Sequence, residues 1–237
     1  MLEMVDADAG YAGTQVLWGV SMKVGGGEIV SMMGPNGSGK STLLKAIAGL
    51  VRLSSGRILL DGKDLARVPA ENRVAHGVAL VLERRRLFST MTVRENLLMG
   101  AYHRSVRDNA QRTLAWVQEL FPILGERRDQ IAGRMSGGEQ QMVAIARGLM
   151  SRPRLLLMDE PFLGLTPRMV SEVVALIHRA QQEGIAVLFN EQNVSVSFGN
   201  SDRGYVLESG RIVAEGSGLG MLEDERVRRV YLGEEVR

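Results

Sequence analysis

Short apolar runs alternate with segments of helical periodicity along most of this chain. The runs that predict buried strands are 16–24, 28–33, 57–60, 77–82, 154–158 and 185–189. The segments that predict helices between or after them are 43–48, 138–150 and 168–183. Strands that alternate with helices of this length are typical of a parallel sheet covered on both faces. The pattern therefore predicts an α/β fold.

The stretch from about 92 to 135 interrupts this alternation, because it has helical periodicity only. Thr92 is a predicted N-cap, and Glu95 three residues later completes a capping box. A further helix at 108–120 should stop before Pro122, since the residue before a proline disfavours helical geometry. We expect a helical lobe inserted into one domain that spans residues 1–237.

A glycine-rich run lies between the predicted strand at 28–33 and the helix that follows it. Its residues fit the pattern G-x-x-x-x-G-K-[ST] and are Gly34, Pro35, Asn36, Gly37, Ser38, Gly39, Lys40, Ser41 and Thr42. Glycines let the backbone N–H groups turn inward, and the helix N-terminus favours a polyphosphate. Lys40 would place a cation at the β- and γ-phosphates, and the Ser41 hydroxyl would bind Mg²⁺. An ordinary glycine-rich turn that caps a helix is the alternative.

Two acids follow the predicted strand at 154–158. Asp159 would hold Mg²⁺ directly or through water, and Glu160 would polarise a water for attack on the γ-phosphate. Acids commonly end strands, so a surface turn is the alternative. The phosphate loop in the same chain favours the hydrolytic interpretation.

A glycine pair precedes the helix at 138–150. Ser136 would cap this helix, while Gly137 and Gly138 would leave its N–H groups uncovered for an anion. Glu139 lies three residues after Ser136, so a simple N-cap without a ligand is equally compatible. These residues alone leave both interpretations open.

Composition excludes several classes of site. Hydrophobic residues make up 45% and charged residues 24% of the 237 positions, as in ordinary globular proteins. There is no cysteine, so disulfides and cysteine metal sites are excluded, and the net charge of +2 gives no argument for a nucleic-acid partner. We find no run of 18 apolar residues and no basic-then-apolar leader. We expect a cytoplasmic protein whose role at a membrane depends on partners.

The three motifs together resemble the ATP-binding cassette family. The run 34–42 resembles its first nucleotide motif, 155–161 its second, and its signature is matched by Ser136, Gly137, Gly138, Glu139 and Gln140. The likeness extends from about Tyr11 to the C-terminus. It implies a P-loop NTPase core with a parallel sheet, an antiparallel β-subdomain and an inserted α-helical subdomain. It also implies a head-to-tail dimer that binds ATP between the phosphate loop and the opposing signature.

Within that family the chain is similar to ATPase subunits of bacterial branched-chain amino-acid importers. The stretches that carry this closer likeness are 82–97, 135–142, 190–193 and 202–208. Glu83 stands where most of the wider family has a Gln that contacts Mg²⁺, and Gln192 where most have a His that senses the γ-phosphate. We interpret both as subfamily features that keep these roles. Phe162, where many members have Ser, has no role assigned by the resemblance.

Two further features each have an ordinary structural alternative. The family places an aromatic residue against adenine near Tyr11, and such stacking contributes roughly 1 kcal/mol. Tyr11 packed on the β-subdomain is the alternative. The segment 84–92 combines three arginines with Leu87, Phe88 and Met91, a composition enriched at interfaces. It would contact a cytoplasmic helix of a membrane subunit or lipid headgroups, unless it is a solvated basic face beside core residues.

The sequence therefore predicts an ATP-hydrolysing, energy-coupling importer subunit that uses ATP and Mg²⁺. Its substrate would be branched-chain or other hydrophobic amino acids, and its partners transmembrane permease subunits and a second ATPase subunit, identical or a sister chain. It would lie on the cytoplasmic face of the membrane. The alternatives are an ATPase for urea or lipopolysaccharide transport, a non-transport cassette ATPase and a pseudo-enzyme. The single cassette without a long insertion disfavours DNA or ribosomes as partners, and the intact Lys40, Asp159 and Glu160 disfavour a pseudo-enzyme.

Overall fold

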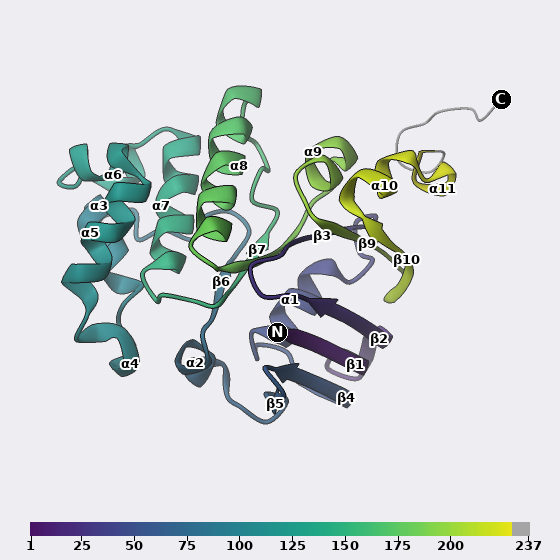
Figure 1. Cartoon of the computed structure of the whole chain (residues 1–237). Coiled ribbons are helices and arrows are strands. Elements are labelled where there is room, and N and C mark those ends of the chain that lie inside the picture. The colour runs from purple at the N-terminus through teal and green to yellow at the C-terminus, as the bar shows by residue number, and fades with distance from the viewer. Residues whose placement is uncertain (229–237) are drawn as a thin grey trace.

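Two β-sheets face each other across a helix in the computed structural model, which describes residues 1–228 (Figure 1). The larger sheet has the order β10-β9-β3-β8-β7-β6, parallel except for the pair β9 and β10. Its strands are β3 (Ile29–Met33), β6 (Val78–Val81), β7 (Leu155–Asp159), β8 (Ala186–Asn190), β9 (Arg203–Glu208) and β10 (Arg211–Ser217). The smaller, antiparallel sheet consists, in the order β2-β1-β4-β5, of β1 (Leu2–Tyr11), β2 (Thr14–Val24), β4 (Leu53–Leu60) and β5 (Lys63–Asp64). The predicted core and antiparallel β-subdomain are confirmed.

Helices cover both faces of the larger sheet (Figure 1). The helix α1 (Lys40–Ile47) lies between the sheets, while α7 (Gly137–Leu149) and α8 (Pro167–Gln182) pack on the opposite face. The remaining α-helices are α2 (Ala70–Arg73), α3 (Val93–Met99), α4 (Arg104–Arg107), α5 (Ala110–Leu120), α6 (Pro122–Glu126), α9 (Val194–Gly199), α10 (Gly218–Glu223) and α11 (Glu225–Val227). Within residues 1–228, no helix has the length and apolar character needed to cross a bilayer.

The central strands are mostly apolar because both of their faces are buried; the exceptions are Ser31 in β3 and the terminal residues Asp159 of β7 and Asn190 of β8. Along β7, Leu155 and Leu157 join the cluster that contains α1 and the antiparallel sheet. Leu156 and Met158 point the other way and join the cluster that contains α7 and α8. Successive side chains of a strand lie on opposite faces of its sheet, so a strand covered on both sides has a nearly continuous apolar sequence. The unbroken runs in the sequence therefore correspond to these strands.

The predicted helical stretch forms the lobe α3–α6, which lies beside α7 (Figure 1). Thr92 Oγ1 accepts a hydrogen bond from the N–H of Glu95 at 3.2 Å, and Glu95 Oε2 accepts one from the N–H of Thr92 at 2.8 Å. The predicted capping box is thus confirmed. The helix α5 ends at Leu120, also as predicted, and α6 begins at Pro122.

The strand β1 was not expected from the sequence, and β4 begins four residues earlier than its predicted start. The acidic residues in β1 argue against a strand on propensity alone. The structure uses them to bridge neighbouring strands at irregular points in the register. Asp8 accepts hydrogen bonds from the N–H of Gly19 at 2.6 Å and from Ser55 Oγ at 2.7 Å. These long-range partners cannot be read from the local pattern.

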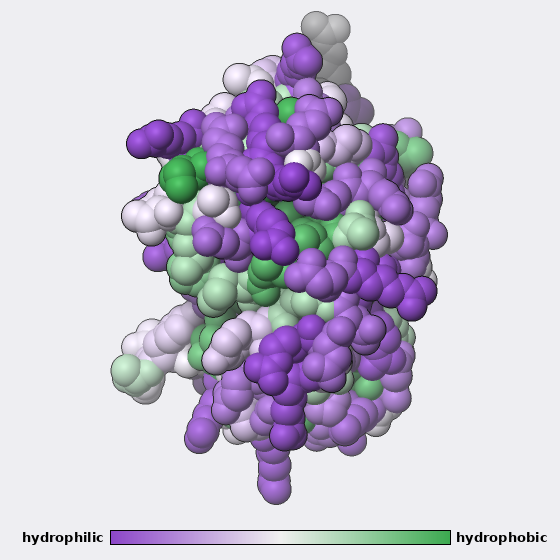
Figure 2. Space-filling view, turned by 90° about the vertical axis from the view of Figure 1, so that its left-hand side faces the viewer, coloured by the Kyte–Doolittle hydropathy of each residue, from purple (hydrophilic) through white to green (hydrophobic). Residues whose placement is uncertain are grey.

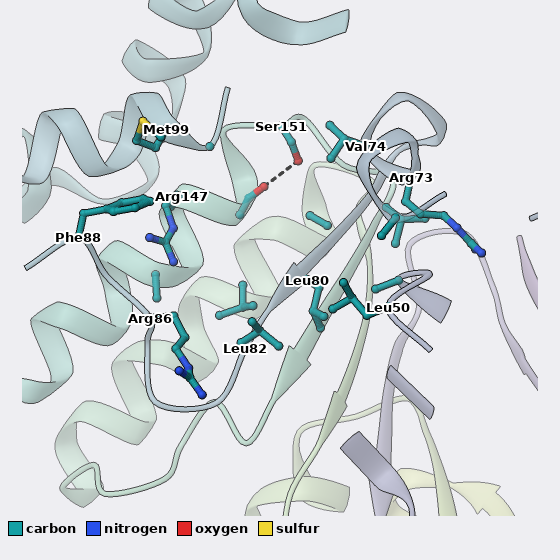
Figure 3. A pocket seen from close by; sticks show the side chains of 18 residues that line it. Leu50, Arg73, Val74, Leu80, Leu82, Arg86, Phe88, Met99, Arg147 and Ser151 are labelled. Atoms are coloured by element: carbon teal, nitrogen blue, oxygen red, sulfur yellow. Dashed lines mark hydrogen bonds between the residues drawn. The ribbon is translucent and has the colours of Figure 1, made fainter. Parts of the chain in front are cut away.

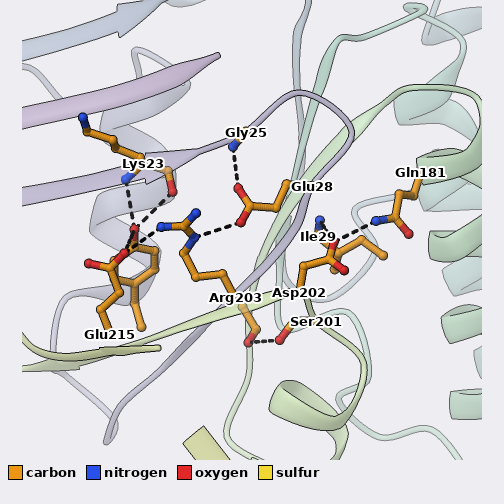
Figure 4. A network of polar contacts seen from close by, with 11 residues as sticks. Lys23, Gly25, Glu28, Ile29, Gln181, Ser201, Asp202, Arg203 and Glu215 are labelled. Carbon is orange, nitrogen blue, oxygen red and sulfur yellow. Dashed lines mark hydrogen bonds and ion pairs between the residues drawn. The ribbon is translucent and has the colours of Figure 1, made fainter. Parts of the chain in front are cut away.

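A polar network joins the sheets at the edge where β3 begins (Figure 4). Arg203 forms ion pairs of 2.8 Å with both Glu28 and Glu215. These two acceptors raise the pKa of the Arg203 guanidinium. The Tyr205 hydroxyl accepts a hydrogen bond of 3.1 Å from the N–H of Lys23 at the end of β2. The network therefore fixes the antiparallel sheet to the core at the edge opposite the phosphate loop.

Candidate active site

The glycine-rich run forms a loop from the end of β3 to the start of α1. Gly39 is the N-cap of α1 with a φ of 107°, a left-handed conformation that favours glycine. A Cβ at this position would lie 2.9 Å from Leu17 Cδ2 and would require this side chain to shift. Lys40 is buried, and its Nζ donates hydrogen bonds to the carbonyl oxygens of Gly34 at 2.6 Å and Pro35 at 3.1 Å. The loop therefore wraps around one cationic group.

The electrostatic surroundings of Lys40 are set by burial and by the acids at the ends of neighbouring strands. Burial lowers the pKa of Lys40, and the negative charges of Glu160 and Asp159 oppose this shift. Strand order explains the arrangement, because β3, β8 and β7 are adjacent and parallel and end at one edge. Such an edge is where α/β sheets bind their ligands.

A chain of hydrogen bonds connects the predicted metal and base residues at this edge. Asp159 Oδ1 accepts hydrogen bonds from Ser41 Oγ at 2.8 Å and from Asn190 Nδ2 at 2.7 Å. Asn190 Oδ1 accepts one from the N–H of Glu160 at 2.7 Å. Glu160 Oε1 then accepts one from Gln192 Nε2 at 2.8 Å. The structure thus brings together Ser41, Asp159, Glu160 and Gln192.

The Glu160 side chain lies over the phosphate loop, because the chain turns sharply at the end of β7. Glu160 has a φ of 48°, and its N–H is held by the fully buried Asn190. A cavity of about 300 Å³ opens here between the loop and Glu160. The cavity is lined by Val16, Asn36, Gly37, Gly39, Lys40, Ser41, Thr42 and Glu160. A carboxylate and a cation therefore face one space.

Two polar residues of this site, Asn190 and Glu191, were not assigned a role from the sequence. Both are buried, and Asn190 is paired in register with Asp159 of the neighbouring strand. Glu191 accepts hydrogen bonds from the N–H groups of Phe162 at 2.9 Å and Gln192 at 3.1 Å. The signal in the sequence was their place directly after an apolar strand, beside a parallel strand that ends in acids.

Two predicted ligand residues lie at the margins of the site. Tyr11 ends β1 with 46% of its surface exposed, and its hydroxyl accepts a hydrogen bond of 3.4 Å from Thr42 Oγ1. Glu83 follows β6, and its carboxylate pairs with Arg84 Nε at 3.2 Å. Adenine stacking by Tyr11 and a metal contact by Glu83 both stay predictions.

The signature residues lie at the start of α7. Among the described residues, none of them lines the cavity at the phosphate loop. Ser136 caps α7 as predicted, in a capping box with Glu139. Glu139 also pairs with Arg127 at 2.9 Å. Gly138 is buried under Met169 of α8, whose Cε would lie 1.9 Å from a Cβ at position 138. Glycine at this position therefore serves close packing, in addition to the anion-binding role that the sequence suggested.

The residues around the loop fit a phosphate ligand with Mg²⁺. Ser38 Oγ is buried, and none of the described residues forms a hydrogen bond with it. A buried hydroxyl without a partner is costly, so a polar ligand in the loop would satisfy it. Ser41 Oγ and Asp159 Oδ1 lie 2.8 Å apart and are the oxygen donors that Mg²⁺ prefers. Mg²⁺ sites usually combine a few such protein ligands with water and substrate phosphates.

A groove of about 480 Å³ lies between the core and the helical lobe (Figure 3). The Phe88 ring lines it, is 43% exposed and lies 5.6 Å from the Arg147 guanidinium. The side chain of the buried Asn96 accepts a hydrogen bond from the N–H of Phe88 at 2.9 Å and donates one to the Phe88 carbonyl oxygen at 3.0 Å. Figure 2 shows an apolar band between hydrophilic regions on the side of the molecule that carries the lobe. The ring is thus held at an accessible surface.

The neighbours of Phe88 do not all share this exposure. Leu87 packs against the hydrophobic core, which agrees with the alternative of a core-filling residue. Arg85 lies against the signature helix, with its Nη1 at 3.5 Å from Gln140 Oε1, whereas Arg84 and Arg86 are exposed. Of the predicted interface residues, Phe88 and Arg86 line the groove.

Comparisons with known proteins identify the family of this chain. The family model described as "ABC transporter" matches residues 17–163, more than half of the chain. The chain belongs to the ATP-binding cassette transporter family. Over 233 residues it is 45% identical to the high-affinity branched-chain amino acid transport ATP-binding protein BraG of Pseudomonas aeruginosa, with 98% of this chain and 100% of BraG covered. The assignment to ABC transporter ATPases is confirmed.

Other members of the family match over similar lengths. The probable branched-chain amino acid transport protein LivF of Archaeoglobus fulgidus is 34% identical, with 98% of this chain and 99% of that one covered. The lipopolysaccharide export protein LptB of Escherichia coli K12 is 33% identical, with 96% and 95% covered. A solved ATP-binding cassette in its ADP conformation is 28% identical, covers 99% of each chain and has a TM-score of 0.88. The predicted ABC ATPase fold is confirmed.

Proposed function

We propose that this chain hydrolyses MgATP to drive the import of branched-chain or other hydrophobic amino acids. The observation that carries the proposal is the hydrogen-bonded chain from Ser41 through Asp159 and Asn190 to Glu160 and Gln192. This hydrogen-bonded chain supports a site in which Ser41 and Asp159 would hold the metal, Glu160 would act as general base and Gln192 would contact the γ-phosphate. The 45% identity to BraG, against 33–35% to LptB proteins, favours amino-acid import over lipopolysaccharide export.

Each polar side chain of the site has its own part in an in-line attack by water. Lys40 and the loop N–H groups offset charge on the β- and γ-phosphates. Glu160 orients the attacking water and accepts its proton. The Gln192 amide has two N–H donors, of which one holds Glu160 and the other is available to the γ-phosphate. Gln192 therefore links the base to the group under attack.

Ser41 and Asp159 are the residues that would hold Mg²⁺. When bound, the ion would neutralise developing charge on the phosphate oxygens. Glu83 follows β6, the strand next to β7, and so lies at the same edge of the sheet as Asp159. We propose it as a further metal contact, and Tyr11 as the residue that stacks on adenine. For these roles, the Glu83 side chain must turn from Arg84 toward the metal, and the Tyr11 side chain must turn from Thr42 toward adenine.

The signature requires a second ATPase subunit to act on ATP. Within residues 1–228, the cavity at the chain's own phosphate loop is not lined by the signature residues 136–140 at the start of α7. We therefore propose a head-to-tail pair, of two identical chains or of this chain with a sister subunit. Each signature would then complete the site of the other subunit.

The groove beside Phe88 is the proposed contact with the permease. An exposed aromatic ring among Leu50, Met99 and the arginines Arg86 and Arg147 has the composition of an interface anchor. A short cytoplasmic helix of a transmembrane subunit would bind there through its apolar face. The chain would thus work as a peripheral subunit on the cytoplasmic side of the membrane.

The proposal is tested by uptake into vesicles that contain the cognate permease and the purified ATPase. We expect ATP-dependent uptake of labelled leucine, and no uptake of labelled urea. A matched preparation with Lys40→Ala is the control, because it removes the cation from the loop. ATP hydrolysis without leucine uptake would refute the substrate assignment, and absence of hydrolysis would refute the ATPase assignment.

A further inference from the structure

A buried carboxylate ties together the loop after β7 and the loop after β8. Glu191 is 6% exposed, and its Oε1 and Oε2 accept hydrogen bonds from the N–H groups of Phe162 at 2.9 Å and Gln192 at 3.1 Å. We propose that Glu191 is a positioning residue for ATP hydrolysis, which holds the Gln192 amide against the general base Glu160. This inference rests on the ATPase activity proposed above.

Both hydrogen-bond partners of Glu191, Phe162 and Gln192, lie next to the general base Glu160. Phe162 follows Glu160 by two positions, and Gln192 Nε2 lies 2.8 Å from Glu160 Oε1. Hydrogen bonds to an ionised acceptor are stronger than those between neutral groups. A ring is therefore closed from Glu160 through Phe162, Glu191 and Gln192 back to Glu160. A shift of either loop would change the Gln192–Glu160 contact.

An apolar contact reinforces the same junction and gives the bulky residue at position 162 a role. The rings of Phe162 and Phe189 meet edge to face, with centroids 5.7 Å apart and an interplanar angle of 78°. Both rings are buried, and Phe189 lies two residues before Glu191 on β8. This geometry is a favoured arrangement of aromatic pairs. A serine at position 162 would keep the backbone N–H but lose the ring contact.

The presence of a carboxylate at position 191 favours a positioning role over simple packing. Burial raises the pKa of Glu191, and the negative charge of Glu160 acts in the same direction, so the carboxylate is held at an energetic cost. A carboxylate offers two acceptor oxygens and no donor, which matches two backbone N–H groups. A glutamine amide would place its own NH₂ against one of them. The structure therefore retains an acid where both loops must be held at once.

The first experiment compares Glu191→Ala and Glu191→Gln with the parent ATPase. We expect Glu191→Ala to lower kcat roughly 10- to 100-fold, the loss that a small misplacement of a reacting group causes, with KM for ATP within about twofold of the parent. The kcat of Glu191→Gln should lie between those of Glu191→Ala and the parent, because the glutamine amide oxygen still accepts one hydrogen bond. Glu28→Ala is the matched control, since Glu28 is a partly buried carboxylate in the network at the opposite sheet edge. It should lower the melting temperature and leave kcat unchanged.

The second experiment asks whether Glu191 acts through Gln192. In the double variant Glu191→Ala and Gln192→Ala, kcat should fall no further than in the slower single variant, since residues that act as one unit are not additive. A Glu191→Ala enzyme with the parent kcat, or with losses that multiply in the double variant, would overturn the inference. A parent protein that does not hydrolyse ATP would instead refute the proposed function, so the two failures are distinct.

Discussion

The side-chain amide of Gln192 donates a hydrogen bond of 2.8 Å to the Glu160 carboxylate, across 32 positions of sequence. The wider family has a histidine at the position of Gln192, as the resemblance implies. A glutamine amide supplies N–H donors, as an imidazole can, but it does not titrate near neutral pH. The base is therefore oriented by a neutral partner, and this contact underlies the first two predictions.

Glu160→Gln should retain ATP binding and lose hydrolysis. The glutamine side chain can still accept the hydrogen bond from Gln192, but it cannot take a proton from water. We expect turnover to fall roughly 10²- to 10⁴-fold, the usual contribution of a general base. Size-exclusion chromatography with ATP should detect a trapped dimer. Hydrolysis at the parent rate would exclude Glu160 as the base.

Gln192→Ala should lower turnover with little change in ATP affinity, because it removes the partner that orients Glu160. Gln192→His should stay active but gain a pH dependence between about 6 and 7, near the ordinary imidazole pKa. The measurement is ATPase rate from pH 5.5 to 8.5 for the parent and both variants. Unchanged turnover in Gln192→Ala would remove this residue from the mechanism.

Phe88→Ala should weaken assembly with the permease and leave the isolated subunit folded. The ring is 43% exposed in the groove, so little core packing is lost, and a truncated anchor costs about 1–3 kcal/mol of association. Leu87→Asp is the contrasting variant, because Leu87 packs on the core. It should lower the melting temperature of the subunit alone. If Phe88→Ala is equally unstable but still transports, the groove is not the docking site.

The capping box at the start of α3 predicts a pH-dependent contribution to stability. Hydrogen bonds from the backbone and side chain of Thr92 lower the pKa of Glu95 below its ordinary value of 4.5. A lowered carboxyl pKa stabilises the folded state above pH 4.5, and this gain is lost as the pH falls through the lowered pKa. Urea unfolding should therefore show Glu95→Gln as less stable than the parent at pH 7, with a smaller difference below pH 4.5. Glu119→Gln on α5 is the control for loss of a surface charge, and an equal deficit at both pH values would contradict the assignment.

Much of the site could be predicted because its chemistry is local in sequence. The phosphate loop needs consecutive residues between a strand and a helix, and a capping box needs partners three positions apart. Thr92 with Glu95 and Ser136 with Glu139 were identified in this way and form as expected. The apolar runs likewise predicted the parallel core, because strands covered on both faces are nearly continuous in apolar residues.

The tertiary structure alone decided which distant residues meet. Asn190 and Glu191 acquire their roles only because β8 lies beside β7 in parallel register, which brings Asn190 to Asp159 and the backbone of Glu160. The strand β1 was missed because its acids disfavour a strand locally, and the bonds of Asp8 to Gly19 and Ser55 that compensate for this are long-range. The sequence by itself determines the chemistry of each residue and its partners within a few positions. Contacts across tens of positions depend on strand order and register, which are set by packing of the whole core.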